Sequence, residues 1–401
     1  MALRKKKAPS GDGVLDTTDL LTALNTKGKK GKKSRVFQTA AEPSISDIRG
    51  VVSTGCFPLD AYLGYPGIPG GIPFGRTTEI FGPESVGKSS LLYAILTNVQ
   101  QGRGVLYTWA RDSTGKFYPK VSEDRLPPGI GVLFDVERRF DKPRAQRIGI
   151  SLENLVQPEE YETFEDVVAR FDQTLKAVTE HPKYADKPIV VGVDTLASAP
   201  TDIEIKKGHS QVGGKAKLVR EVMRRYTRAI AKRQVAFLVI NQVSDRIGVR
   251  FGGVESPGGR GVRYHSSYRF KMNRISHLRE AGRAIGILSK LQPVKSSVVA
   301  PDFEVLVPVL FSTGVDDAMA VFEFLNDDTK FEKPPIDVDR KGWYLLVDPT
   351  SGKERKFRAS EWFGIYQESE VREWARGKVL EAVKDRIAGK SDADGEEESE
   401  E

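Results

Sequence analysis

The feature that most constrains the fold is a glycine loop, Gly82-Pro-Glu-Ser-Val-Gly-Lys-Ser89, which fits the pattern G-x-x-x-x-G-K-[ST]. A strand-like stretch, 77–81, precedes the loop, and an apolar helical stretch follows it. In this context the glycines let backbone N–H groups turn inward around phosphate oxygens, and the helix start adds a positive dipole. Lysine would reach the outer phosphates and serine would ligate Mg²⁺. The sequence therefore predicts a nucleoside triphosphate site made by Gly82, Pro83, Glu84, Ser85, Val86, Gly87, Lys88, Ser89 and Ser90.

Short apolar runs alternate with helical stretches along the middle of the chain. The predicted strands are 132–134, 189–193 and 235–240, and the predicted helices are 164–178 and 215–232. Apolar runs of five or six residues between helices are typical of buried parallel strands. The pattern predicts an α/β fold with a mostly parallel central sheet. After about residue 315 the segments become mixed and charged, which predicts a small C-terminal α/β domain that ends in a helix at 371–387.

The charge of the chain is unevenly distributed. The whole chain of 401 residues carries a net charge of +7, yet residues 391–401 contain seven acidic residues and no basic one. A basic body suggests a polyanionic partner, and the acidic tail would compete with that partner for the same basic surface, although a purely solubilising role explains the charge equally well. One cysteine and four histidines argue against a disulfide framework and a Cys- or His-based metal site. The absence of a long apolar run predicts no membrane span, and no apolar stretch follows the basic N-terminus as a secretory signal would require.

Carboxylates end two of the predicted strands. Asp194 follows the strand 189–193, where a carboxylate beside a phosphate loop would hold the other side of the Mg²⁺ shell. Hydrolysis also needs a group that orients or deprotonates water. Glu137 is the candidate after the strand 132–134, with Asp135 and Glu153 as alternatives on pattern alone.

A neutral amide can hydrogen-bond a γ-phosphate and release it after hydrolysis. Gln242 follows the strand 235–240, and a glycine-rich segment comes directly after it. This arrangement predicts a switch, while a polar cap at the strand end is the alternative.

Together these motifs resemble the RecA recombinase family, over roughly residues 48–312. The matching segments are 53–55, Leu59-Asp60, Leu63-Gly64 and 70–76 before the loop, 82–90 in it, and 134–141, 147–155, 240–242 and 246–252 after it. The resemblance implies a RecA-type P-loop ATPase core at 48–315. It also implies a basic N-terminal oligomerisation segment at 1–47 that includes a helix near 14–24, a small C-terminal domain at 316–390 and an acidic tail at 391–401.

The resemblance implies an ATP-dependent and Mg²⁺-dependent recombinase. Such a protein forms a helical homo-oligomeric filament on single-stranded DNA, pairs it with homologous double-stranded DNA and exchanges strands, with DNA-dependent ATP hydrolysis. It implies single-strand-binding and mediator proteins as further partners, no membrane, and a cytoplasmic location in a bacterium or a phage-infected host cell.

The resemblance also assigns residues by position. The implied catalytic residues are Glu137, Lys88 and Gln242. Ser89 and Asp194 would bind Mg²⁺, and Asp141 and Arg144 would contact the nucleobase. The implied DNA contacts are Val212, Gly213, Lys217, Arg224, Arg246, Ile247, Arg250, Phe251, Gly258, Gly259 and Arg260. The implied subunit-interface residues are Tyr264, Lys290 and Lys295.

Three departures from the family pattern stand out. The stretch 105–131 is additional, Arg144 stands where an aromatic side chain usually stacks on adenine, and Tyr264 replaces an aromatic that relays nucleotide state. With the long basic N-terminus, they suggest a phage-encoded or otherwise distant homologue. The acidic tail resembles the family's tail, which tempers access to duplex DNA.

Other functions share the phosphate loop. A RecA-like ring helicase or DNA motor is the main alternative, and the loop of Gly258 and Gly259 with Phe251 argues for the recombinase. A coating protein that uses ATP only as structural glue is a third hypothesis, against which an intact Glu137 argues. A P-loop kinase is disfavoured because no acceptor-substrate motif is present.

Overall fold

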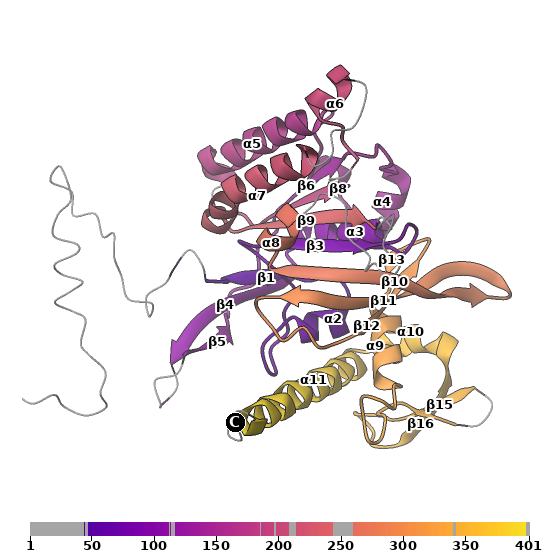
Figure 1. The fold of residues 1–401 in the computed structure, drawn as a ribbon. Coiled ribbons are helices and arrows are strands. Elements are labelled where there is room, and N and C mark those ends of the chain that lie inside the picture. The colour runs from indigo at the N-terminus through magenta and orange to yellow at the C-terminus, as the bar shows by residue number, and fades with distance from the viewer. Residues whose placement is uncertain are drawn as a thin grey trace, which may run out of the picture. The chain divides into compact units, whose positions relative to one another are not determined.

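A nine-stranded sheet lies at the centre of the fold (Figure 1). The computed structural model describes residues 44, 47–111, 113, 117–184, 186–195, 198–207, 214–243, 260–339 and 342–397. Within these residues the strand order is β13-β12-β11-β10-β3-β9-β8-β6-β7. The strands are β3 (Thr77–Gly82), β6 (Ile130–Asp135), β7 (Leu155–Val156), β8 (Ile189–Asp194), β9 (Val235–Gln242), β10 (Tyr268–Glu280), β11 (Arg283–Ser296), β12 (Val305–Leu310) and β13 (Gly314–Val315).

The pairing divides this sheet into a parallel part and an antiparallel part. From β10 through β3, β9, β8 and β6 to β7 all neighbours are parallel, whereas β10, β11, β12 and β13 pair antiparallel. Phe134 of β6 is opposite Val193 of β8, and Val193 is opposite Val239 of β9. Ile80 of β3 is opposite the next residue of β9, so the four central strands end close together. The parallel part therefore gathers the carboxyl ends of its strands at one edge, where ligands bind in open α/β sheets.

Helices cover both faces of the sheet because its buried strands alternate their side chains. Val190, Leu238 and Ile240 face one cluster, which also contains the apolar side chains of α3. Val191 and Val239 face the other cluster, with α5 and α7. The helices are α2 (Phe57–Tyr62), α3 (Lys88–Gln100), α4 (Lys142–Ile148), α5 (Phe164–Glu180), α6 (Asp202–Lys207), α7 (Gly214–Arg233), α8 (Arg260–His265), α9 (Asp317–Leu325), α10 (Trp362–Tyr366) and α11 (Ser369–Glu397), with short 3₁₀ turns η1 (Leu152–Asn154), η2 (Pro182–Tyr184) and η3 (Ala359–Glu361).

The predicted α/β fold is confirmed. The strand predicted at 235–240 spans Val235–Gln242, and the helix predicted at 164–178 spans Phe164–Glu180. Thr163 starts this helix with a capping box, in which its hydroxyl accepts from the Asp166 N–H and the Asp166 carboxylate accepts from the Thr163 N–H. The helix predicted near 14–24 lies outside the described residues. Contacts divide the chain into two units, Met1–Asp47 and Ile48–Glu401, and every helix and strand of the described residues belongs to the second.

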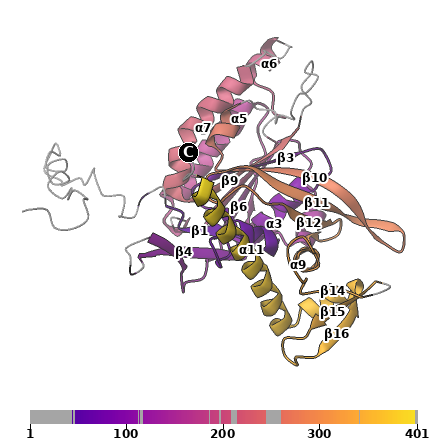
Figure 2. The same ribbon diagram turned by 60° about the horizontal axis from the view of Figure 1, so that its bottom comes forward.

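Two smaller sheets flank the large one. The first has the order β2-β1-β4-β5, with β1 (Gly50–Val52), β2 (Ile72–Pro73), β4 (Gly104–Arg111) and β5 (Phe117–Val121). The second, β14 (Asp337–Val338), β15 (Trp343–Val347) and β16 (Glu354–Arg358), belongs to the C-terminal segment with α10 and α11 (Figure 2).

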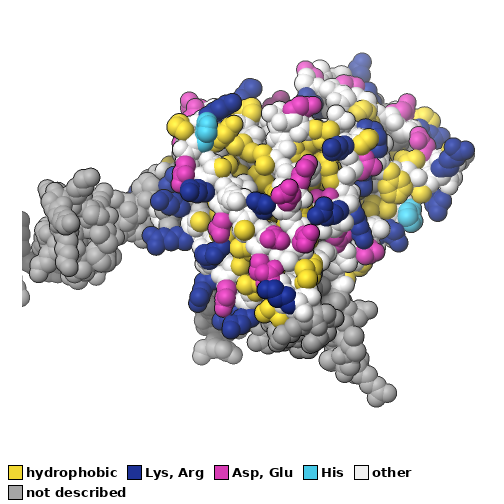
Figure 3. All heavy atoms as spheres, turned by 90° about the horizontal axis from the view of Figure 1, so that it is seen from above, with side chains coloured by type: hydrophobic (Ala, Val, Ile, Leu, Met, Phe, Trp, Pro, Cys, Tyr) yellow, Lys and Arg dark blue, Asp and Glu magenta, His cyan; other side chains and the backbone are white. Residues whose placement is uncertain are grey.

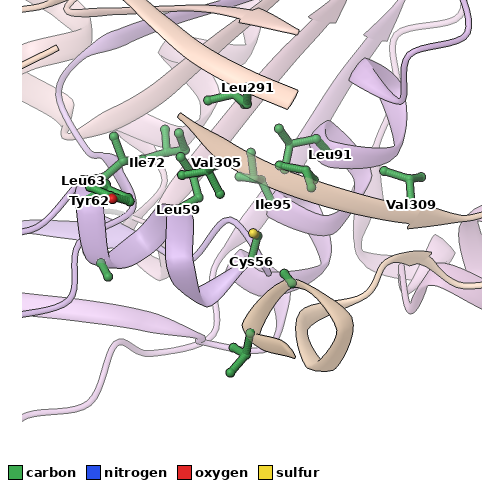
Figure 4. Packing of buried hydrophobic residues seen from close by; sticks show 14 of the residues in the cluster. Cys56, Leu59, Tyr62, Leu63, Ile72, Leu91, Ile95, Leu291, Val305 and Val309 are labelled. Atoms are coloured by element: carbon green, nitrogen blue, oxygen red, sulfur yellow. The ribbon is translucent and has the colours of Figure 1, made fainter. Parts of the chain in front are cut away.

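The C-terminal segment is attached to the rest of this unit through Asp317. The Asp317 carboxylate accepts a hydrogen bond from the Phe57 N–H at 2.7 Å and pairs with Arg376 of α11 at 2.7 Å. Around this contact α2 packs against α9 and α11, and Cys56, Leu59 and Ile95 point toward one another in one apolar cluster (Figure 4). The segment 316–390 therefore shares the hydrophobic core of the preceding residues.

The buried carboxylate of Asp60, in α2, holds the turn that precedes this helix. It is 4% exposed and accepts hydrogen bonds from the Ser53 hydroxyl and from the N–H and hydroxyl of Thr54. Burial raises the pKa of Asp60 to about 7, although these donors oppose the rise.

We expect Asp60 to make the protein less stable as pH rises from about 4 through about 7. The folded state holds the Asp60 proton more tightly than the unfolded chain, so its contribution is complete at low pH and is lost as the pH passes the folded pKa. Urea unfolding of the wild type and Asp60→Asn between pH 4 and 8 measures this. The difference in unfolding free energy should change by a few kcal/mol across the range, and parallel profiles would contradict the assignment.

A second buried charge, Glu79, lies in the middle of β3. Its side chain is fully buried, and it accepts from Asn241 Nδ2 at 2.7 Å and from Arg269 Nε at 2.5 Å. The Arg269 guanidinium in turn lies over the Phe81 ring, 4.8 Å from its centroid. The ion pair joins β10 to β3, and the hydrogen bond from Asn241 joins β3 to β9. Asn241 is the residue before the last residue of β9.

We expect Arg269→Met to lower the free energy of unfolding by about 3–5 kcal/mol, because it leaves Glu79 charged and buried. The double variant Arg269→Met with Glu79→Gln should recover most of that loss, since a glutamine oxygen still accepts from Asn241. Lys378→Met, which breaks an exposed pair with Glu381, is the control and should cost less than about 1 kcal/mol. Urea unfolding compares the three, and equal losses for Arg269→Met and Lys378→Met would contradict the argument.

Candidate functional site

The glycine loop connects the carboxyl end of β3 to the first turn of α3. A Cβ at Gly82 would lie 2.0 Å from the Met272 carbonyl oxygen, so the loop passes β10 too closely for any side chain there. Ser85 and Gly87 adopt left-handed backbone conformations, with φ of +57° and +93°. Alternating backbone of this kind points successive N–H groups into one concavity, which suits phosphate oxygens.

The ammonium group of Lys88 folds back over the loop. Its Nζ donates to the carbonyl oxygens of Gly82 at 2.9 Å and Pro83 at 2.5 Å, and the residue is 7% exposed. Burial lowers the pKa of Lys88, while the carboxylates of Asp194 and Glu137 oppose the decrease. A bound phosphate would offer this cation anionic oxygens in place of two neutral carbonyls.

Ser89 and Asp194 meet across the site. Ser89 Oγ donates to Asp194 Oδ2 at 2.6 Å, although the two residues are 105 positions apart. Burial, with repulsion from Glu137 and Asp135, raises the pKa of Asp194. A hydroxyl and one carboxylate fit Mg²⁺, which usually takes one or two carboxylates together with phosphate oxygens. The described residues contain no cluster of three or more His, Cys, Asp or Glu side chains, so a site that the protein alone completes is not found among them.

Glu137 is the centre of the polar network in this site. Its Oε1 accepts from Gln242 Nε2, Thr195 Oγ1 and Ser198 Oγ, each at 3.0 Å. Its Oε2 pairs with Arg139 at 3.0 Å, and the Glu137 side chain is 12% exposed. The carboxylate is therefore oriented from two sides at the edge where the phosphate loop lies.

The two alternative acids have other surroundings. The Asp135 carboxylate accepts from the backbone N–H groups of Arg139 and Phe140 and so closes the turn after β6. Glu153 is exposed in η1, where it accepts from the Ser151 hydroxyl. Of the three acids, only Glu137 contacts Gln242 among the hydrogen bonds of the described residues.

The two predicted nucleobase residues lie at the start of α4. Asp141 is the N-cap of this helix, and its Oδ1 accepts from the Arg144 N–H at 2.9 Å. The Arg144 guanidinium donates to Ser90 Oγ at 2.7 Å, next to the phosphate loop. Ser90 thus fixes the plane of Arg144 beside the start of α3.

Comparison with known proteins identifies the family. A family model described as RecA N-terminal domain matches residues 19–120 and 112–316. The chain belongs to the RecA family. The protein RecA of Thermus aquaticus is 28% identical over 382 residues, which is 94% of this chain and 98% of that protein. The protein RecA of Chlorobaculum parvum is 30% identical over 299 residues, 73% of this chain and 74% of that protein.

Membership of the RecA family confirms the resemblance, the RecA-type α/β core and the prediction of a DNA-dependent P-loop ATPase. None of the helices in the described part of the chain combines the length and apolar composition that a bilayer span requires.

Some of the predicted DNA contacts lie among the described residues of the RecA-type core, and the others lie outside them. Lys217 and Arg224 are exposed on α7. Basic and acidic side chains are interspersed on the face of the molecule that Figure 3 shows. Arg224 lines a hollow between α5 and α7 that Glu165 and Glu221 also line. The residues that lie outside the described ones are Val212, Gly213, Arg246, Ile247, Arg250, Phe251, Gly258 and Gly259, and Arg260 begins α8 without a described side chain.

Of the predicted interface residues in this RecA-family chain, Tyr264 and Lys295 lie apart from the phosphate loop, whereas Lys290 directly follows Ser289, whose hydroxyl donates to the Val86 carbonyl oxygen of the loop at 2.8 Å. Tyr264 is 64% exposed on α8, and Lys295 Nζ donates to the Arg263 and Tyr264 carbonyl oxygens at 2.9 and 3.0 Å. Lys290 pairs with Glu304 at 3.0 Å. α8 precedes the start of β10, so Tyr264 and Lys295 lie near the amino ends of the parallel strands.

Sequence reasoning missed the partners of Glu137. Thr195, Ser198 and Arg139 contact its carboxylate; Thr195 and Ser198 lie outside the matched motifs, and Arg139 lies in the segment 134–141 but was assigned no role. Thr195 follows Asp194 directly, which is a signal that could have found it. The contact of Arg139 depends on the turn after β6, which the sequence did not specify.

We expect Lys88→Met to reduce the affinity for ATP at least about 100-fold, because a buried charge-assisted contact to phosphate is lost. Binding of a fluorescent ATP analogue measures the change. Lys353→Met, an exposed lysine in the turn before β16, is the matched control and should bind like the wild type. Retained affinity in Lys88→Met, with the circular dichroism of the wild type, would contradict the geometry of the loop.

Proposed function

We propose that this RecA-family chain is an ATP-dependent recombinase, which forms a helical filament on single-stranded DNA and catalyses homologous pairing and strand exchange. The observation that carries the proposal is the 3.0 Å hydrogen bond from Gln242 to Glu137. It joins the acid that would activate water to the strand end that leads directly into the segment of the predicted DNA contacts Arg246 to Arg260. A contact of this kind couples the state of the nucleotide to the segment that would hold DNA.

The hydrolytic step follows from the positions of the polar groups. Glu137 would accept a proton from the attacking water, while Thr195 and Ser198 hold one of its oxygens in place. Lys88 would move from the carbonyls of Gly82 and Pro83 to the outer phosphates and offset the charge that develops there. Mg²⁺, held by Ser89 and Asp194, would supply charge neutralisation on the phosphates.

The coupling step would use Gln242. While the γ-phosphate is present, the Gln242 amide can donate to it, and after phosphate loss it can return to Glu137 as observed. Because β9 ends at Gln242, either state changes where the next segment of chain begins. Asn241, held by Glu79, would limit this movement to the Gln242 side chain and the residues after it.

Assembly and DNA contact complete the proposal. Residues 1–47 would link neighbouring copies, ATP would lie between copies, and Lys290, Lys295 and Tyr264 would lie at that interface. Val212 and Ile247 would insert between bases, while Lys217, Arg224, Arg246 and the other predicted cations contact phosphates. Asp141 and Arg144 would contact the nucleobase, and the acidic tail would compete with duplex DNA.

The cellular setting is proposed from the family. Single-strand-binding and mediator proteins would be partners, and the protein would act in the cytoplasm of a bacterium or a phage-infected host. The segments 48–315 and 316–390 would act as core and accessory domain.

ATP turnover with and without single-stranded DNA tests the function. We expect DNA to stimulate turnover in the wild type, and Glu137→Gln to lower the stimulated rate at least about 100-fold while ATP-dependent DNA binding survives. Glu153→Gln, which changes the exposed acid in η1, is the matched control and should behave like the wild type. A strand-exchange assay then follows on the wild type.

Two outcomes would contradict the recombinase. Turnover that duplex DNA stimulates, without a stable complex on single strands, would indicate a translocating motor. No turnover at all would indicate a coating protein and remove the catalytic role of Glu137.

A further inference from the structure

The stretch 105–131, which departs from the family pattern, folds into a hairpin of β4 and β5. β4 pairs with β1, and β5 pairs with β4 alone, so β5 is an edge strand of the small sheet. The hairpin, defined here as the two strands β4 (Gly104–Arg111) and β5 (Phe117–Val121), exposes large apolar side chains. Those of Trp109, Phe117, Tyr118 and Val121 are 41%, 41%, 43% and 41% exposed.

One face of the hairpin combines aromatic rings with a cation. Arg111 is directly opposite Phe117 and Trp109 is opposite Pro119, so these four side chains lie on the same face. The Arg111 guanidinium lies over the Phe117 ring, 4.4 Å from its centroid. Tyr118 and Lys120 lie on the opposite face, where a ring and a cation are again neighbours.

The base of this aromatic face is fixed to the body. Tyr107 is buried, and its hydroxyl donates to the Pro69 carbonyl oxygen at 2.9 Å. The Tyr65 ring packs edge-on against the rings of Tyr107 and Trp109, at centroid distances of 5.7 and 5.9 Å. Trp109 is therefore held at one side and exposed at the other, which lowers the entropy cost of binding a flat ligand.

The edge of β5 disfavours a partner strand. Pro119 at the middle of the strand has no N–H to donate, and the lysine beside it adds charge to the edge. A partner of the hairpin must therefore contact the faces of the hairpin and not the edge of β5.

The charge of the faces indicates the chemistry of that partner. Arg103, Arg111 and Lys120 are exposed and form no ion pair with a described residue. Exposed rings interleaved with such cations are the surface on which single-stranded nucleic acid binds, since bases stack on rings and phosphates meet cations. The rings and the cations together favour this partner over an apolar protein surface.

The hairpin lies away from the phosphate site. α3 begins at the glycine loop and ends at Gln100, the hairpin follows, and β6 begins at Ile130. The hairpin is therefore at the amino ends of the parallel strands, whereas Asp194 and Gln242 are at the carboxyl ends. A strand held there is not in contact with the ATP site of the same copy.

We propose that the β4–β5 hairpin is an accessory site for single-stranded DNA, in which bases stack on Trp109 and Phe117 while Arg111, on the same face, contacts phosphates. The site is additional to the DNA contacts predicted at 212–224 and 246–260. It rests on the proposed function only in that the protein meets single-stranded DNA.

Tryptophan emission tests the site directly in the full chain with ATP and oligo(dT). Trp109 is one of four tryptophans, and the others, Trp343, Trp362 and Trp374, lie in the C-terminal segment. We expect oligo(dT) to quench the emission of the wild type, and Trp109→Phe to lose that quenching. The double variant Arg111→Gln with Phe117→Leu should bind oligo(dT) about 10-fold more weakly and with a smaller salt dependence, at an unchanged DNA-free ATP turnover.

The control is Phe363→Ala, which removes a 61% exposed ring on α10 and should bind DNA like the wild type. Quenching that persists in Trp109→Phe, or wild-type affinity in the double variant, would overturn the proposal. Quenching that depends on protein concentration without DNA would instead assign the hairpin to contact with a second copy. If these variants bind normally while Glu137→Gln loses turnover, the hairpin proposal alone fails. If no variant and no wild-type sample binds oligo(dT), both it and the proposed function fail.

Discussion

The site depends on the parallel register of four strands. β3, β9, β8 and β6 end at the same edge, so the glycine loop, Gln242, Asp194 and the turn that carries Glu137 meet there. Glu137 and Gln242 have long side chains that lose conformational entropy when they are fixed, and the aligned strand ends reduce this cost by placing the two residues within hydrogen-bond reach. The hydrogen bonds of 2.6 and 3.0 Å in this site therefore follow from backbone pairing that apolar burial on both faces stabilises.

Beneath this edge the buried Glu79 joins β3 to both of its neighbouring strands. An ionised carboxylate inside a sheet is costly unless it is paired and hydrogen-bonded, and Glu79 has both Arg269 and Asn241 as partners. Since Asn241 directly precedes Gln242, this pairing gives the switch residue a rigid neighbour. Movement on nucleotide loss would then be confined to the chain beyond β9, which is the property a coupling element needs.

The sequence alone predicted what depends on local pattern. The glycine loop has a fixed spacing, and apolar runs such as 235–240 mark strands buried on both faces, so the loop, the central strands and the acids at their ends were all predictable. It did not predict contacts that depend on tertiary arrangement. Thr195 and Arg139 reach Glu137 only because a turn brings them there, and Asp141 as an N-cap depends on where α4 begins. Glu79 was included in a predicted strand without its partner, because Arg269 is 190 residues away.

The amino ends of the parallel strands accept an inserted segment more readily than the carboxyl ends, and this explains where the hairpin lies. At the carboxyl ends Lys88, Asp194 and Glu137 each have a defined partner, so an inserted segment would displace a contact of the ATP site. At the amino ends the chain only passes from α3 to β6, and connections of this kind accept insertions at little thermodynamic cost. Pairing of β4 with β1 gives the insertion a fixed base, and Pro119 protects its outer edge from strand addition. A rigid, aromatic and cationic surface was thus added to the RecA-type core at the end where it leaves the chemistry of the phosphate site unchanged.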